Sequence, residues 1–326
     1  MIDFAKSIST GAAVFFRAFL PTLLKKLPIA LGTLWFVATL VFLLTKLAGG
    51  EADMIGGEGR MDERTRQAIM QRYYLDQPLH IQYVKNMQKV AVFDSLPART
   101  KQDRTLRELL SQHLPASIGL GWRAVLLAVL LGVPIGVMCA VKHNEAIDQG
   151  GIVLSLLGVS VPNFVLASLA VFFLARVLGW LPATGWHESW WRMWIPAACL
   201  GAFPFAAILR LTRASMLEAL RQDYVRTARS KGVAEYKVVL RHALRNSLSS
   251  VVTYIGPVVA ALLTGSLVVE KIFAVPGIGE LLVHSINNRD MPLLLGLVVF
   301  FSATLIFMNL LVDSLYPVIN PRLRDA

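Results

Sequence analysis

Long apolar stretches, nearly free of charged side chains, alternate with charged segments along the whole chain. A helix of about 20 apolar residues is long enough to cross the roughly 30 Å hydrocarbon core of a bilayer. Six stretches approach or reach this length, and a charged residue ends most of them. The pattern therefore predicts an all-α, polytopic membrane protein with six transmembrane helices, at residues 28–46, 116–141, 151–175, 194–209, 251–269 and 291–312.

The segments around these spans complete the predicted organisation. Residues 1–27 are basic and lack an obvious small-residue cleavage site after the first apolar run, so we expect a cytoplasmic segment that is not a cleaved signal. Residues 47–115 form a long polar loop with short helical stretches, expected to be a periplasmic cap. Residues 116–326 form the core domain, which includes a polar loop at 210–249.

Composition supports this class and sets the orientation. The chain has 326 residues, of which 55% are hydrophobic and 16% are charged, whereas an ordinary soluble domain has about 25% charged residues. A net charge of +11 would suit a nucleic-acid binder, but the apolar content is too high for a soluble one. Lys and Arg collect in cytoplasmic loops, and residues 210–245 hold nine of them against three acidic residues. We therefore expect this loop and both termini in the cytoplasm.

Signals for catalysis or metal binding are absent from the sequence. It contains no GxxxxGK phosphate loop and no HExxH pair, and its six histidines are scattered. Cys139 and Cys199 lie inside apolar runs and are expected to be small core residues. We expect a protein that is not an enzyme and that binds no cofactor or metal itself.

The loop at 210–249 is too polar to cross a membrane, yet it is regularly patterned. Apolar residues recur at helical spacing over 214–230 and over 234–248, and Ser230-Lys231-Gly232 lies between these segments. A glycine just past a helix end allows the chain to turn. The pattern predicts two short amphipathic helices joined by a tight turn. They would either face anionic lipid or dock into a groove on a soluble partner, and the pattern does not separate the two.

Several motifs bring out a family resemblance. Residues 223–232, DYVRTARSKG, followed by LRHALRN at 240–246, closely resemble the cytoplasmic "EAA" loop of binding-protein-dependent ABC permeases of the dipeptide/oligopeptide/nickel family. Further matches follow the family's order along most of the chain, at residues 75–78, 131–136, 158–164, 178–182, 269–273, 276–279 and 288–292. The sequence departs from the family at its longer N-terminal segment and at Ala48-Gly49-Gly50-Glu51 after the first span.

The resemblance implies a permease bundle of an ABC type I importer in the bacterial inner membrane. Its loop would contain a coupling helix that docks on an ATPase subunit, with contacts from Arg226, Thr227, Ala228, Arg229, Ser230, Lys231, Gly232 and Tyr236. The implied partners are a second, homologous permease, two ATPase subunits that hold ATP and Mg, and a periplasmic or lipid-anchored solute-binding protein. The cargo stays open between a dipeptide, a longer peptide, a nickel chelate and another small solute.

Two pairs of residues are candidates for the translocation path. Pro162 and Asn163 lie within the third span, and Gly256 and Pro257 lie within the fifth. A proline in a membrane helix frees backbone carbonyls, which is tolerated where helices pack or line a cavity. Interhelical packing is the alternative explanation for the first pair.

A third group of residues is a candidate outer gate or a contact for the binding protein: Glu270, Pro276, Gly277, Gly279 and Asp290. An ionisable residue at membrane depth suggests a function, although Glu270, at the predicted end of a span, would also be stable in water. Pro276 and the two glycines would equally suit turns that shape a short outer helix.

Two other classes of function are weaker explanations. A secondary transporter needs ionisable residues at mid-membrane and often shows an internal repeat, and the centres of spans three to six have essentially no such residues. A membrane-embedded enzyme or scaffold is the other alternative, and the lack of clustered catalytic groups counts against the enzyme.

Overall fold

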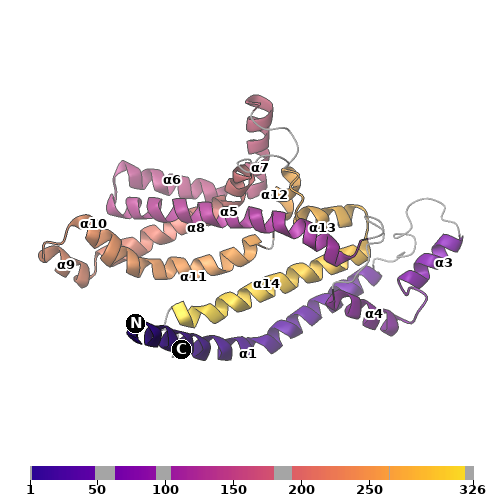
Figure 1. Cartoon of the computed structure of the whole chain (residues 1–326). Coiled ribbons are helices and arrows are strands. Elements are labelled where there is room, and N and C mark those ends of the chain that lie inside the picture. The colour runs from indigo at the N-terminus through magenta and orange to yellow at the C-terminus, as the bar shows by residue number, and fades with distance from the viewer. Residues whose placement is uncertain (1, 48–62, 93–103, 180–192, 264, 320–326) are drawn as a thin grey trace. The chain divides into compact units, whose positions relative to one another are not determined.

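The computed structural model describes residues 2–47, 63–92, 104–179, 193–263 and 265–319. Every regular element in these ranges is helical (Figure 1), which confirms the all-α prediction. Within these ranges five helices are long and apolar enough to cross a membrane, and a bent pair raises the number to six if it counts as one span. The principal helices are α1 (Ile2–Leu47), α3 (Glu63–Arg72), α4 (Leu79–Ala91), α5 (Leu106–Val141), α6 (Ala146–Ser160), α7 (Asn163–Val171), α8 (Trp194–Leu220), α11 (Leu244–Leu263), α12 (Leu267–Ile272), α13 (Ile278–Asn287) and α14 (Met291–Ile319).

The first two spans belong to longer helices than the hydropathy pattern predicted. The N-terminal segment is helical and runs without a break into the first span, so that α1 has 46 residues. Helix α5 begins at Leu106 rather than at residue 116 and has 36 residues. At 1.5 Å per residue it is about 54 Å long, well beyond the hydrocarbon thickness.

The third span is not one straight helix. Helix α6 and the helix formed by α7 and a π-helical segment, η1 (Phe172–Val177), meet at 97°. The residue before a proline is disfavoured in the α conformation, and Val161 is accordingly extended (φ −90°, ψ 118°). Pro162 then precedes the first turn of α7, where it needs no N–H donor. The prediction of a continuous helix over 151–175 is therefore wrong.

The fifth span also differs from the prediction. A continuous helix runs from Glu235 to Leu263, so the second amphipathic helix predicted at 234–248 is the base of this span. The span ends before residue 269 because Gly265 has a positive φ of 98° and Ser266 caps a new helix, α12. The Ser266 hydroxyl accepts the N–H of Val269 at 3.3 Å.

The described chain divides into two compact units. Unit 1 comprises residues 1–25, 119–263 and 308–326, and unit 2 comprises residues 26–118 and 264–307. In unit 1, α8 packs against α6, α7 and α11. Small residues allow these close approaches, as is common between membrane helices: a Cβ added to Gly201 of α8 would lie 2.8 Å from the Ala124 carbonyl oxygen of α5.

Two apolar clusters hold unit 2 together. The first joins the start of α5 to α13 and α14 through Leu106, Leu109, Ile278, Leu281, Leu293 and Leu297. The second joins α4 to α1 and α14 around Phe42 and Val90. Tyr83 adds a hydroxyl contact of 2.8 Å to Thr39 and an edge-on ring contact to Phe42. Within the polar loop predicted as a cap, α4 is thus fixed to α1.

A buried carboxylate shapes the turn between α12 and α13. Glu270 is fully buried and accepts backbone N–H groups from Ser266 (3.2 Å), Gly279 (2.7 Å) and Glu280 (3.2 Å). The last two belong to the first turn of α13, where N–H groups have no partner within the helix. Burial raises the pKa of Glu270, while hydrogen bonds from Ser117 and these N–H groups oppose the rise. Glu270 therefore caps the N-terminus of α13.

Glycines make room for this carboxylate. A Cβ on Gly277 would lie 2.2 Å from Glu270 Oε2 and 2.6 Å from the Ser117 hydroxyl, and one on Gly279 would lie 2.8 Å from the same carboxylate oxygen. Asp290 has a similar capping role at the following helix, since its Oδ1 accepts the N–H of Leu293 at the start of α14.

Gly277→Ala should destabilise unit 2, because the new methyl group would displace the Glu270 carboxylate. Overpacking of a filled site costs on the order of 1–3 kcal/mol, so the thermal midpoint of the detergent-solubilised protein should fall. Gly150→Ala is the matched control, because a Cβ there meets nothing within 4 Å. Equal thermal midpoints for the two variants would contradict this account of the turn.

Candidate functional site

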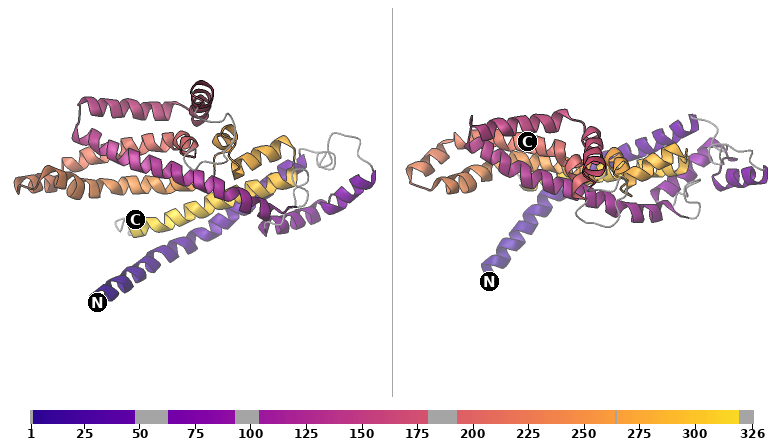
Figure 2. Two further views of the ribbon diagram at one scale, coloured as in Figure 1. Left: turned by 45° about the horizontal axis from the view of Figure 1, so that its top comes forward. Right: turned by 90° about the horizontal axis from the view of Figure 1, so that it is seen from above.

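The segment between α8 and α11 forms a compact helical hairpin. It consists of α9 (Asp223–Ser230), a one-turn α10 (Glu235–Lys237) and a π-helical segment, η2 (Val238–Ala243), that leads into α11. Figures 1 and 2 show it at one end of unit 1, past the ends of α8 and α11. We call residues 223–243 the 223–243 hairpin. The predicted tight turn between two helical segments is confirmed, while the bounds of both segments differ from the prediction.

Gly232 makes the turn of the hairpin. Its φ is +76°, a left-handed conformation that glycine adopts without steric cost. Its N–H donates to the Arg229 carbonyl (2.9 Å), and the N–H of Val233 donates to the Ala228 carbonyl (3.2 Å). These two bonds define a Schellman motif, which closes a helix and reverses the chain. The glycine expected from the sequence to end this helix does so.

The helix predicted over 214–230 is interrupted, which the spacing of apolar residues did not lead us to expect. Helix α8 ends at Leu220, Gln222 is extended (φ −73°, ψ 152°) and α9 starts at Asp223. The spacing of the residues that pack on the apolar cluster explains the break. Leu220 and Val225 both contact this cluster but are five residues apart, whereas residues on one face of a helix are three or four apart. Only a bend keeps both residues on the same apolar cluster.

The inner side of the hairpin is fixed to the ends of the membrane helices. A buried cluster unites residues of α5, α8, α9 and η2: Ala140, Met216, Ala219, Val225, Ala228, Val238, Val239 and Ala243. Val233, the residue after the turn, packs on this cluster, as does Leu217. The hairpin is therefore a firm extension of unit 1 rather than a loose linker.

The outer side of the hairpin is mostly polar. Its exposed side chains are those of Asp223, Tyr224, Arg226, Thr227, Arg229, Ser230, Lys231, Ala234, Glu235, Tyr236, Lys237, Leu240 and Arg241. Arg229 bridges the turn, with Nη2 at 2.6 Å and Nε at 3.1 Å from the two Glu235 carboxylate oxygens. This carboxylate raises the pKa of Arg229. A two-bond contact of this kind holds the guanidinium in a defined orientation.

The structure divides the eight predicted coupling residues by role. Ala228 is buried in the cluster, and Arg229 braces the turn. The others lie on exposed positions of one short hairpin: Arg226, Thr227, Ser230, Lys231, Gly232 and Tyr236.

Two residues of the hairpin were not among the predicted ones. Glu235 could have been found from its position three residues after Gly232. Leu240 was not among them either; it is 58% exposed, and no pattern distinguished it from its buried neighbours.

A polar groove adjoins the base of the hairpin. Residues from the end of α8, from α9 and from the start of α11 line it: Ser215, Glu218, Ala219, Gln222, Tyr224, Arg245, Asn246, Ser247, Ser249 and Ser250. Exposed residues continue along α11 at steps of three or four, namely Asn246, Ser250, Thr253 and Pro257. This spacing places them on one face. A polar stripe on an otherwise apolar span suits a water-filled cavity better than lipid.

The four candidate path residues lie on two different helices. Pro162 and Asn163 mark the 97° bend between α6 and α7. Pro257 lies on the exposed face of α11, whereas Gly256 faces α14, since a Cβ there would lie 2.3 Å from Val312 Cγ1. Pro257 therefore fits a path-lining position and Gly256 fits helix packing.

The five candidate gate residues are structural in this conformation. Glu270 and Asp290 are fully buried, and Gly277 and Gly279 surround the Glu270 carboxylate. The Pro276 carbonyl oxygen lies 3.1 Å from the His113 ring Nδ1. The Glu270 and Asp290 carboxylates are thus inaccessible to another protein in this conformation. The five residues instead stabilise the arrangement of α12, α13 and α14.

Arg229→Ala and Glu235→Ala should loosen the turn by similar amounts. Each variant removes the same exposed ion pair, which is worth up to about 1 kcal/mol, so the amides of residues 231–233 should exchange with solvent a few-fold faster. Hydrogen exchange read by mass spectrometry measures this. Arg226→Ala is the control, because its contact to Asp223 is long (3.4 Å) and highly exposed. Unchanged exchange in both variants would show that Arg229 does not brace the turn.

Comparison with known proteins gives the same family that the hairpin suggested. Residues 132–325, more than half of the chain, match the family described as "Binding-protein-dependent transport system inner membrane component". The chain is 40% identical to the dipeptide transport system permease protein DppB of Bacillus subtilis over 90% of this chain and 94% of that protein. It is 37% identical to the oligopeptide transport system permease protein OppB of Escherichia coli K12 over 90% and 96%.

A putative peptide transport system permease protein of Brucella abortus is 39% identical over 93% of this chain and 98% of its own length. These matches span α1 to α14 and so include the hairpin. Such identity over nearly full length, together with the family match, shows the family directly. The chain is a multi-pass inner-membrane protein and belongs to the family of inner membrane components of binding-protein-dependent transport systems.

Proposed function

We propose that this chain is a permease subunit of an ATP-driven importer and that a separate ATPase subunit drives it through the 223–243 hairpin. The observation that carries the proposal is the two-sided construction of the hairpin. Its apolar side is bound to α5 and α8, and its polar side is exposed and braced by the Arg229–Glu235 pair.

This construction favours protein docking over lipid binding. A helix that lies in a membrane interface buries its own apolar face in the lipid. In the hairpin that face is already covered by the chain's own helices, and the outer face carries arginine, lysine, hydroxyl and tyrosine groups. A rigid polar projection of this kind fits a groove on a soluble partner.

Charge distribution supports a cytoplasmic hairpin. Because Lys and Arg favour cytoplasmic loops, the excess of basic residues over 210–245 favours placing the hairpin and both termini inside the cell. The polar loop that contains α3 and α4 would then face the periplasm. There it would lie on the side from which a solute-binding protein delivers cargo.

The proposed assembly has four kinds of subunit. This chain pairs with a second, homologous permease, two ATPase subunits bind ATP and Mg below them, and a periplasmic or lipid-anchored binding protein docks above. The proposed cargo is a dipeptide or oligopeptide, because the relatives named above are peptide permeases. A nickel chelate or another small solute is the alternative cargo.

The proposed mechanism is a rigid-body switch between two states. Closure of the ATPases would displace the hairpin, and its apolar cluster would carry the displacement into α5 and α8. The polar residues on the exposed face of α11, and Pro257 on the same face, would line some of the path that opens.

Gly232→Trp should abolish co-purification of ATPase subunits with this chain. No atom lies within 4 Å of a Cβ at this position, so the indole would project from the docking surface. Gly232→Asn is the control, because asparagine tolerates the left-handed conformation and adds little bulk. Both variants should insert into the membrane in equal amounts. Normal ATPase recovery with the Trp variant would refute docking at the turn.

The orientation is testable by labelling. In intact spheroplasts, Lys231→Cys should resist a membrane-impermeant maleimide and Gln88→Cys should react, because they would lie on opposite sides of the membrane. Both positions are exposed, and the native Cys139 and Cys199 are buried. Permeabilised cells should label at both positions. Labelling of Lys231→Cys in sealed spheroplasts would reverse the proposed topology.

A further inference from the structure

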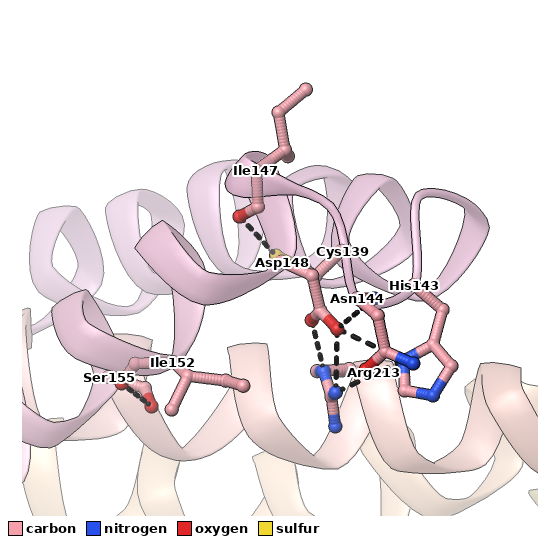
Figure 3. A network of polar contacts seen from close by, with 8 residues as sticks. All are labelled: Cys139, His143, Asn144, Ile147, Asp148, Ile152, Ser155 and Arg213. Carbon is pink, nitrogen blue, oxygen red and sulfur yellow. Dashed lines mark hydrogen bonds and ion pairs between the residues drawn. The ribbon is translucent and has the colours of Figure 1, made fainter.

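An ion pair with a buried carboxylate lies outside the hairpin and outside the candidate path. Asp148, in the first turn of α6, is fully buried, and Arg213 of α8 contacts both of its carboxylate oxygens. The distances are 2.5 Å from Arg213 Nε to Asp148 Oδ1 and 2.8 Å from Nη2 to Oδ2 (Figure 3).

The turn between α5 and α6 completes the site. The backbone N–H of Asn144 donates to Asp148 Oδ2 at 2.9 Å, and His143 Nδ1 lies 3.0 Å from the same oxygen (Figure 3). Asn144 has a positive φ of 65°, which this hydrogen bond helps to hold. One carboxylate thus binds the α5–α6 turn and α8 together.

Stability alone does not explain such a pair. Burying the Asp148 carboxylate completely and the Arg213 side chain in large part (21% exposed) has a desolvation cost, and a packed apolar pair in the same place is often equally stable or more stable. A two-bond arginine–carboxylate contact does, however, fix the register of one helix against another. Contacts between small apolar residues, such as that of Gly158 with Ala206 farther along α6 and α8, define register less strictly.

The position of Arg213 connects the pair to the hairpin. Met216 and Ala219 follow it within two turns of α8, and both belong to the apolar cluster under the hairpin. Helix α8 then ends at Leu220, and α9 begins three residues later. A force on the hairpin therefore reaches Arg213 through continuous helix and a packed cluster.

We propose that the Asp148–Arg213 pair is the joint that carries the displacement of the hairpin from α8 into α6, which makes Asp148 and Arg213 positioning residues for coupling. This inference rests on the proposed function, because it takes the hairpin as the point where the ATPase acts. Through the joint, α6 moves together with α8. The bend at Pro162 and Asn163 at the far end of α6 then moves with it.

Distances between spin labels test the joint. The complex is purified by an affinity tag on this chain and reconstituted into liposomes, with labels on Gln149→Cys in α6 and Ala214→Cys in α8, which are both exposed. Distances are measured without nucleotide and after trapping with ATP and vanadate. In the otherwise unchanged chain the α6–α8 distance should be the same in both states, because the two helices move as one.

Asp148→Asn should change this result while ATPase subunits stay bound. The α6–α8 distance should now shift or broaden on trapping, and the stimulation of ATP hydrolysis by the binding protein and cargo should fall roughly tenfold, within the range usual for coupling between sites. Arg213→Lys, which keeps the charge but loses the two-bond contact, should lie in between. Glu145→Gln is the control, since its partner Lys142 and the Glu145 side chain itself are exposed, and it should behave as the unchanged chain.

Each remaining outcome has a definite meaning. If the α6–α8 distance in Asp148→Asn broadens equally with and without nucleotide, the pair is only a structural contact and the joint is overturned. An α6–α8 distance in Asp148→Asn that stays unchanged in both states would overturn the joint as well. If Asp148→Asn fails to assemble while Arg213→Lys behaves as the unchanged chain, the pair serves folding and the joint is again overturned. Absence of any ATPase from the unchanged complex would instead refute the proposed function.

Discussion

Every backbone N–H and C=O group at membrane depth needs a partner within the protein, because hydrocarbon offers none. This requirement explains why every regular element of the described chain is helical and why some helix starts are closed by a specific side chain. Ser266 and Asp290 accept amide hydrogens at the starts of α12 and α14. Glu270 does the same for α13 from a neighbouring helix. At these three helix starts a side chain supplies the partner that the helix itself lacks.

The long spans were predictable from the sequence because hydropathy depends on local composition alone. The turn at Gly232 was predictable for a similar reason, since a glycine between two amphipathic segments is a local signal. The bend at Pro162 had a local signal as well, which the length of the apolar run obscured. The break at Gln222 was missed because its only signal is a change in the spacing of apolar residues, from four between Met216 and Leu220 to five between Leu220 and Val225.

Other features depend on contacts distant in sequence. The carboxylate of Glu270 and the hydroxyl of Ser117 share the α13 N-terminus across more than 150 positions, so a sequence alone does not reveal that Glu270 is a buried cap. The same holds for Asp148 and Arg213, which no sequence motif singled out. Both carboxylates follow one rule, namely that a buried polar group is stable where several hydrogen-bond donors surround it. In this protein, buried carboxylates fix where helices begin and how they register.

The π-helical segment η2 is the last part of the hairpin and leads directly into α11. A π turn contains one residue more than an α turn, and each residue of an α-helix advances the direction of the side chains by about 100°. The faces of α10 and of α11 are therefore offset from those of one uninterrupted α-helix. The proposed docking surface of the hairpin and the face of α11 that borders the groove therefore point in different directions around the helix axis than they would in one uninterrupted α-helix.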